Sequence, residues 1–199
     1  MKLAKTEHTS QPWRIHEIAP DFRLEDVWAL PTPGGPDDFP QLVELMESFD
    51  PATSTPAPVR ALFALRLKLG EVLGWDSPKA GLGSRVPTLR DRLPADLRDT
   101  AASAEAGDGH FRGLYRTENE LALEIANQTV HAILHLGWVP DGAGRYRGQM
   151  AILVKPNGLF GQAYMAAITP FRYLLVYPAM LRELGREWPL AAPVAASTP

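Results

Sequence analysis

The sequence predicts a mixed α+β fold in which an antiparallel sheet is followed by a long C-terminal helix. Between residues 121 and 138, and again between 145 and 155, apolar residues alternate with other residues at a spacing of two, which is typical of half-buried strands. Further along the chain the apolar residues recur at the spacing of one helix face. These residues are Leu174, Tyr177, Leu181, Leu184 and Trp188.

The segment between Tyr115 and Val139 decides the fold. If it is a hairpin, its turn lies at Asn127-Gln128, and the apolar residues on both sides of the turn point to one face of the sheet. The β-branched side chains of Thr129, Val130 and Ile133 favour strands, because branching at Cβ suits extended backbone. The Asn-Gln pair fixes the turn less firmly than Asn-Gly would.

A helix is the alternative structure for the same segment. Thr117, followed three residues later by Glu120, has the pattern of a capping box, and Gly137 could end such a helix. The periodicity alone therefore leaves both structures open, with strands slightly favoured.

Two histidines make this choice important for chemistry. On a helix, His131 and His135 would share one face at a metal-ligand spacing, although Ala132 stands where the zinc-protease motif carries its glutamate. On a strand the two residues lie about 13 Å apart, which is too far for one metal ion to bind both. The hairpin would place Glu124 opposite His131 and Glu120 opposite His135 as two cross-strand pairs.

Three interpretations of these pairs remain open. The first, which we favour, is a polar outer face with paired charges. The second is a role in binding or proton transfer, because a carboxylate beside an imidazole raises the pKa of the imidazole into a useful range. The third is a metal site, which we do not expect.

Length, charge and cysteine content narrow the class of protein. The chain has 199 residues, no cysteine and a formal net charge of -3. We expect one domain with an ordered core at about 13–188, an irregular insertion at 76–110 and a disordered tail at 189–199. The charge does not favour a nucleic-acid partner, and the absence of cysteine fits a cytoplasmic protein. The first twenty residues lack the apolar segment of a signal peptide, and we expect no cofactor.

The remaining elements follow from local patterns. We expect a short edge strand at 13–18 and a strand with an irregular step at 22–30. A helix should run from Asp38 to near Phe49, and a second helix from Thr55 to Gly74. Within the irregular insertion, residues 88–93 should form one helical turn.

The apolar stretch from Leu159 to Leu181 is long enough to span a membrane, with 23 residues and a single charge, Arg172. Two prolines and Gln162 argue against a span, and an arginine near the bilayer centre costs about 2.5–3.5 kcal/mol. We therefore expect no transmembrane span, while contact with a membrane surface stays open.

Five short stretches of this chain resemble one protein family. They are Phe63-Ala-Leu-Arg66-Leu-Lys68-Leu-Gly70, Tyr115 to Glu120 with Leu121-Ala-Leu-Glu124, Val130-His131, Pro156-Asn-Gly158 with Tyr164, and Ile168-Thr-Pro170-Phe171-Arg172. The chain resembles, from about Phe22 to Trp188, the bacterial domain of unknown function 2867 family. That family is similar in turn to the helix-grip (SRPBCC) superfamily of polyketide cyclases, plant allergen-like lipid binders and START-like domains.

The resemblance implies a curved antiparallel sheet that grips a long C-terminal helix, with a cavity between them. It favours strands for residues 118–137 and a gripped helix for 159–188. In the family a histidine usually follows the Pro-Phe pair, where this chain has Arg172. An arginine suits an anionic ligand group or a structural carboxylate partner better than it suits an acid/base role. The family carries no established activity.

The alternating face of the sheet supplies the candidate lining of such a cavity. The candidate ligand-binding residues are Leu134, Trp138, Met150, Tyr164, Arg172 and Tyr177. Our first hypothesis is a soluble binding module for a small apolar or amphipathic ligand. The second is an enzyme of cyclase or isomerase type, in which Glu124–His131 or Glu120–His135 acts as acid and base in the cavity. The third is a structural or regulatory partner with a filled core. A non-enzymatic role is favoured.

Overall fold

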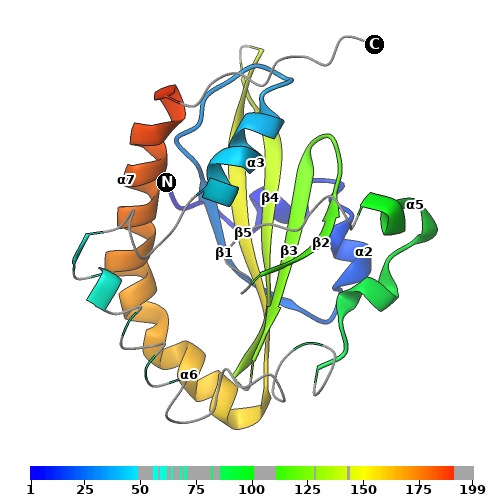
Figure 1. Ribbon diagram of the computed structural model, residues 1–199, viewed down its shortest axis with the longest axis vertical. Coiled ribbons are helices and arrows are strands. Elements are labelled where there is room, and N and C mark those ends of the chain that lie inside the picture. The colour runs from blue at the N-terminus through cyan, green and yellow to red at the C-terminus, as the bar shows by residue number, and fades with distance from the viewer. Residues whose placement is uncertain are drawn as a thin grey trace.

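A five-stranded antiparallel sheet and a long C-terminal helical segment dominate the fold (Figure 1). The computed structural model describes residues 1–48, 56–57, 59–61, 64, 68, 70, 82, 86–100, 111–127, 129–142 and 144–190. The strands are β1 (Arg23–Ala29), β2 (Arg112–Arg116), β3 (Glu120–Ala126), β4 (Val130–Gly142) and β5 (Arg145–Pro156). Their order in the sheet is β1-β5-β4-β3-β2.

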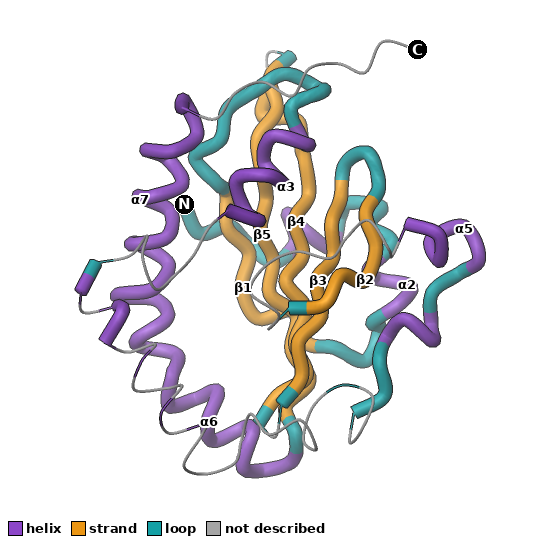
Figure 2. The backbone as a smooth tube through the Cα atoms, viewed as in Figure 1, coloured by secondary structure: helices purple, strands orange, loops and turns teal. Residues whose placement is uncertain are grey.

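Helices cover both faces of this sheet (Figure 2). The C-terminal segment consists of α6 (Gly158–Phe171), the π-helical turn η4 (Arg172–Val176), α7 (Tyr177–Glu187) and the short η5 (Trp188–Leu190). It lies on the same side as α3 (Phe39–Ser48). The opposite side is covered by α1 (Thr6–Thr9), α2 (Ile15–Ile18), η2 (Leu89–Arg92) and α5 (Ala95–Arg98).

The two sides of the sheet belong to two separate hydrophobic clusters. Ala122, Ile133 and Ala151 lie on the side that packs against α2, η2 and α5, which we name the back face. Leu121, Leu136 and Met150 lie on the side that packs against α3 and α7, which we name the helix face. The alternation predicted from the sequence is therefore confirmed, with apolar residues buried on both faces.

The hairpin interpretation is confirmed, and so is the third strand that follows it. The Thr117-to-Glu120 pattern does not begin a helix. Instead it closes the turn between β2 and β3, where the Thr117 N–H donates to the Glu120 carbonyl at 2.8 Å and the Glu120 N–H donates to the Thr117 hydroxyl at 3.1 Å. Sequence reasoning missed β2 as a separate edge strand. The mixed α+β class with its long C-terminal helix is confirmed, and the helix-grip assignment stays a prediction.

The hairpin turn lies one residue later than predicted. The side chain of Asn127 accepts the N–H groups of Thr129 at 2.9 Å and Val130 at 3.1 Å, so Asn127 opens the turn and the strands pair from Ala126 with His131 onwards. An asparagine that bonds to backbone N–H groups further along is a common way to begin a turn.

Of the elements predicted in the N-terminal half, one is wrong and three are confirmed. Residues 13–18 are not an edge strand, because residues 15–18 form α2, whose apolar side chains pack on the back face. The irregular strand at 22–30 is confirmed as β1, which carries a bulge. The first predicted helix is confirmed as α3, and the predicted turn at 88–93 as η2. Most of the second predicted helix, both ends of the 76–110 insertion and residues 191–199 of the predicted tail lie outside the described residues, whereas residues 189 and 190 belong to the helical turn η5.

The C-terminal helix departs from the predicted stripe at one point. Leu174 was expected on the buried face but is 73% exposed, whereas Tyr177, Leu184 and Trp188 are buried. The π-helical turn η4 explains the difference, because its wider winding resets the helix phase just before α7. Pro178 explains the turn in part, since its ring would clash with the Leu174 carbonyl in a regular α-helix. None of the helices in the described part of the chain has the length and apolar character that a membrane crossing requires.

Candidate functional site

A bulge in β1 brings one acidic side chain to the helix face. Leu24 pairs with Leu153, and Asp26 pairs with Ile152, so two steps along β1 match one step along β5. In a regular strand Leu24 and Asp26 would share a face. The extra residue, Glu25, leaves Leu24 against the back-face cluster and turns Asp26 toward the C-terminal helix.

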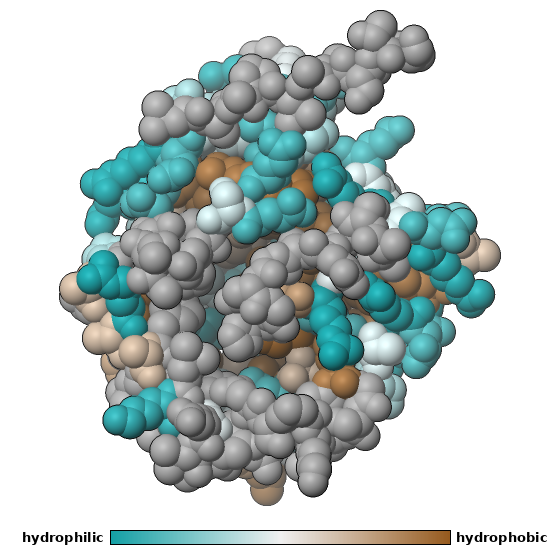
Figure 3. Space-filling view, in the orientation of Figure 1, coloured by the Kyte–Doolittle hydropathy of each residue, from teal (hydrophilic) through white to brown (hydrophobic). Residues whose placement is uncertain are grey.

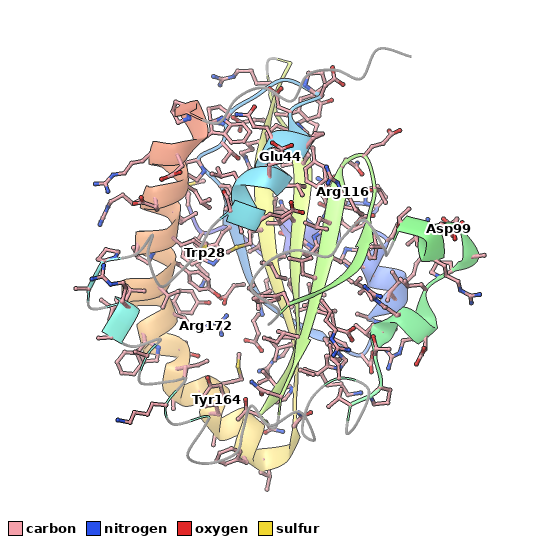
Figure 4. All side chains as sticks on the ribbon, in the orientation of Figure 1. Trp28, Glu44, Asp99, Arg116, Tyr164 and Arg172 are labelled. Carbon is pink, nitrogen blue, oxygen red and sulfur yellow. The ribbon has the colours of Figure 1, made fainter. Side chains whose placement is uncertain are left out.

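Asp26 is the centre of a buried polar group formed with the C-terminal helix. Figure 4 shows Arg172, which belongs to this group, on that helix, on the side of Trp28. Its carboxylate accepts the Tyr177 hydroxyl at 2.7 Å, and it also accepts hydrogen bonds from the Arg172 guanidinium and the Tyr173 hydroxyl. Arg172 donates in addition to the Tyr177 oxygen, from Nε at 3.1 Å and from Nη2 at 2.6 Å. We name Asp26, Arg172, Tyr173 and Tyr177 the Asp26 cluster.

The π-helical turn makes this convergence possible. Residues five apart approach one another where hydrogen bonds join i to i+5, and Arg172 and Tyr177 are five apart. Burial raises the pKa of Tyr177 well above its usual range, against the opposing effect of Arg172, so its phenol stays protonated and donates to Asp26. The charges of Asp26 and Arg172 cancel, which leaves the cluster without net charge.

An apolar row extends from Asp26 across the sheet. Asp26 pairs with Ile152, Ile152 with Leu134, and Leu134 with Leu123, so these four side chains lie side by side on the helix face. Ile152 and Leu134 belong to inner strands and are nevertheless partly exposed. Their strand neighbours on the back face, such as Ile133 and Ala151, are fully buried. Figure 3 shows apolar surface recessed on this side of the molecule.

The next row along β1 begins with Trp28. It pairs with Met150, which pairs with Leu136, and its ring packs against Tyr177 at a centroid distance of 4.7 Å. Trp28 is therefore an immediate neighbour of the Asp26 cluster.

The structure brings four of the six predicted ligand-binding residues to this region: Leu134, Met150, Arg172 and Tyr177. Trp138 lies elsewhere on the helix face, where its indole N–H donates to the Gly35 carbonyl at 2.9 Å and its ring packs near Trp188. Tyr164 lies on α6 and is partly buried. Asp26, Trp28 and Tyr173 were missed by the sequence reasoning. The available signal was Asp26 beside the apolar residues Val27 and Trp28, in a strand for which an irregular step was predicted.

The two predicted Glu–His pairs form, but on the back face. His131 Nε2 lies 2.7 Å from a carboxylate oxygen of Glu124, and His135 Nε2 lies 2.9 Å from one of Glu120. The partners are diagonal neighbours, because Glu124 is directly opposite Ile133 and Glu120 opposite Gly137. The predicted direct pairing and the polar outer face are both wrong, since all four side chains are buried under the N-terminal and 88–98 segments.

Each of the two glutamates accepts a backbone N–H hydrogen bond from the segment that covers it. Glu124 accepts the Thr88 hydroxyl at 2.7 Å and the Leu89 N–H at 2.8 Å, at the start of η2. Burial alone would raise the pKa of Glu124, but the hydrogen bonds from His131, Leu89 and Thr88 outweigh it and lower that pKa. We name each Glu–His pair, together with the hydroxyl and backbone N–H groups that donate to its glutamate, a Glu–His clamp.

The second clamp has the same construction. Glu120 accepts the hydroxyl of Tyr115, which lies on β2, and the N–H of Arg14 at the start of α2, each at 3.1 Å. A bulge in β2 between Gly113 and Tyr115 places Tyr115 opposite Ala122, on the back face. Each glutamate thus accepts a hydroxyl, a backbone N–H and an imidazole.

A third imidazole extends the Glu120 clamp. His8 Nε2 lies 3.2 Å from His135 Nδ1. Burial lowers the pKa of His135, and it lowers the pKa of His8 to about 2 with a further contribution from His135. Both rings are therefore neutral: His135 donates from Nε2 to Glu120 and accepts at Nδ1 from His8. Within the described part of the chain no group of three or more acidic, histidine or cysteine side chains is arranged to hold a metal ion.

Comparison with protein families matches residues 18–179 to the family described as "Protein of unknown function (DUF2867)". The chain belongs to the DUF2867 family. The matched range contains the Asp26 cluster and both Glu–His pairs, whereas His8 and Arg14 precede it. No curated protein and no solved structure matches this DUF2867 chain significantly. The predicted family is confirmed, and its placement in the helix-grip superfamily stays a prediction.

Proposed function

We propose that this DUF2867 protein binds a small amphipathic molecule on the helix face of its sheet. The apolar part of the ligand lies over Ile152 and Leu134, and its polar end lies beside the Asp26 cluster. The observation that supports this most is the row that joins Asp26 to Ile152 and Leu134 on adjacent strands. A mainly apolar floor with a few polar groups at one end is the usual composition of a small-molecule site.

Incomplete burial in the middle of the sheet favours binding over a filled core. Side chains of inner strands are normally covered on both faces when helices pack on both sides. Ile133 and Ala151 on the back face follow this rule, whereas Ile152 and Leu134 on the helix face remain partly exposed. A filled core would have left the two faces alike.

The Glu–His clamps do not favour the cyclase alternative. They lie on the face opposite the floor, and each glutamate is already held by three donors. An acid or base must reach the proton that it transfers. The hypothesis that these pairs act in a cavity on the helix face therefore lacks its catalytic groups, and ligand binding without chemistry is the function we propose.

Native mass spectrometry of the protein purified from its own host, followed by a thermal-shift screen with fatty acids, quinones and anilinonaphthalene sulfonate, tests the proposal. We expect a retained ligand or a probe that raises the melting temperature. Leu134→Trp should weaken probe binding by about tenfold or more, because the indole fills the floor. Leu174→Trp is the matched control, since Leu174 is on the outside of the helix, and it should bind the probe as the wild type does. Bare protein with no shift by any probe contradicts the proposal.

A further inference from the structure

Trp28 has a polar atom that the fold leaves without a partner. The side chain is only 7% exposed, and its Nε1 atom is buried with no hydrogen-bond acceptor in the described part of the chain. The indole N–H can only donate. Buried donors without a partner are rare in folded proteins, and each needs an explanation.

The other tryptophans of the helix face show how this fold normally treats such a group. Trp138 donates its indole N–H to the Gly35 carbonyl at 2.9 Å, and Trp188 donates to the Pro33 carbonyl at 2.9 Å. Trp13, which also has an unpaired N–H, lies over Gly137 on the back face, where the clamps seal the surface. Trp28 alone among these four combines an unpaired donor with a partly exposed floor beside it.

Resting on the proposed function, we infer that the ligand carries a neutral carbonyl group, as in a ketone, quinone or ester, and that this group accepts a hydrogen bond from Trp28 Nε1. The indole ring that carries this donor lies beside the polar end of the site, because it packs against both Tyr177 and Tyr173, at centroid distances of 4.7 and 6.0 Å. The partner that the indole lacks is an acceptor, and a carbonyl oxygen is the acceptor that serves the other two tryptophans of this face.

The charges around Trp28 favour a neutral acceptor over a carboxylate. Asp26 neutralises Arg172, and the hydroxyls of Tyr173 and Tyr177 are already donated to Asp26. Of the two predicted roles for Arg172, the structure therefore supports the structural carboxylate partner. An anionic ligand group beside this cluster would be repelled by the Asp26 carboxylate. The ammonium of Lys2 lies over the ring of Tyr173, 4.2 Å from its centroid, in a cation–π contact.

The distance between the polar end and the far side of the floor indicates the size of the apolar part. From Asp26 to Leu134 the row crosses two strand spacings of about 4.8 Å each. A fused pair of six-membered rings or a short alkyl chain covers this span. A naphthoquinone is therefore a suitable probe, and the absence of cysteine from the chain removes thiol addition as a side reaction.

The test compares 2-methyl-1,4-naphthoquinone with 2-methylnaphthalene, which has the same apolar skeleton without the carbonyls. Affinities are measured by equilibrium dialysis for the wild type, Trp28→Phe and Trp188→Phe. We expect the wild type to prefer the quinone by about tenfold, the value of one recovered hydrogen bond. Trp28→Phe should reduce this preference to within about twofold and keep the affinity for the hydrocarbon, whereas Trp188→Phe should keep the preference.

A second measurement does not depend on the folding of the variants. In the wild type, the indole N–H resonance of Trp28 should move downfield on addition of the quinone and not on addition of the hydrocarbon. A quinone preference that survives Trp28→Phe, equal binding of the two probes, or tighter binding of laurate than of the quinone overturns the carbonyl assignment and leaves the proposed function intact. Failure of every probe in the wider screen overturns the proposed function, and the carbonyl assignment with it.

Discussion

The two faces of the sheet both bury acidic side chains, but they use them differently. On the back face, Glu120 and Glu124 accept donors from the segments that cover them, and the surrounding side chains are sealed. On the helix face, Asp26 is equally well satisfied, yet Ile152 beside it is partly exposed. Buried charges therefore mark an attachment point on both faces, and the uncovered apolar surface is what distinguishes the face that can bind a ligand.

Both polar groups depend on the same backbone device. A bulge on the edge strand β1 turns Asp26 to the helix face, and a bulge on the other edge strand, β2, turns Tyr115 to Glu120. Bulges are common at sheet edges and re-aim side chains there. Each edge of this sheet is thus fastened to a different set of helices.

Glu120→Ala should have the largest effect, because it breaks the back-face attachment. The Tyr115 hydroxyl, the Arg14 N–H and the His135 imidazole would lose their acceptor. We expect the free energy of unfolding to fall by about 3–5 kcal/mol in urea titrations. As the control, Glu183→Ala removes an exposed pair with Arg186 and should cost less than about 1 kcal/mol. Equal effects of the two substitutions would contradict the clamp interpretation.

Two isoleucines on neighbouring inner strands sharpen the comparison of the faces. Ile133→Ala removes a fully buried side chain from the back face, and Ile152→Ala removes a partly exposed one from the helix face. We expect losses of about 3–4 kcal/mol for Ile133→Ala and about 1–2 kcal/mol for Ile152→Ala. The free energies of unfolding come from the same urea titrations. Similar losses would mean that the helix face is as tightly filled as the back face.

The smallest expected effect is the response of the back face to pH. His8 has a pKa of about 2 in the folded protein and about 6.5 when unfolded, so the unfolded chain takes up a proton first as the pH falls. The stability contribution is therefore complete above pH 6.5 and is lost as the pH falls below it. His135, whose pKa is also lowered, acts in the same direction.

Between pH 7.5 and 5.5 we expect the free energy of unfolding to fall by about 1–2 kcal/mol. His8→Gln should remove most of this change, about 1.4 kcal/mol, because the amide keeps a donor for His135 but does not titrate. The interval from pH 7.5 to 5.5 lies above the pH at which Glu124, whose pKa is lowered, takes up a proton. Protonation of the histidines and protonation of Glu124 therefore affect stability at different pH values. An unchanged pH dependence in His8→Gln would assign it to other groups.

Periodicity favoured strands over a helix only slightly, and the family resemblance decided between them, but once the hairpin is accepted the Glu–His partners follow for a physical reason. Moving the turn by one residue changes the partner directly opposite by two positions, which keeps every side chain on its face. Glu124 therefore still meets His131, and Glu120 still meets His135, as diagonal neighbours instead of direct ones.

The features that sequence reasoning missed arise where one extra residue interrupts a periodic pattern. The bulge at Glu25 moves Asp26 to the other face, and the π-helical turn moves Leu174 out of the predicted stripe. The irregular step predicted within residues 22–30 is this bulge, but the alternation did not show at which residue it falls, and the π-helical turn left no mark in the helical spacing. Which face the N-terminal segment covers was also unpredictable, because it follows from hydrogen bonds to the glutamates made by α2, a segment expected to be a strand.

The most direct test of the helix-face site is an NMR titration of the isoleucine methyl groups with 2-methyl-1,4-naphthoquinone or with whichever probe the thermal-shift screen identifies. Ile152 and Ile133 lie on adjacent central strands and point to opposite faces. We predict that the Ile152 methyl resonance shifts in a saturable way while that of Ile133 stays in place. A saturable shift at Ile133 without one at Ile152 would place the ligand on the wrong side of the sheet and contradict the account.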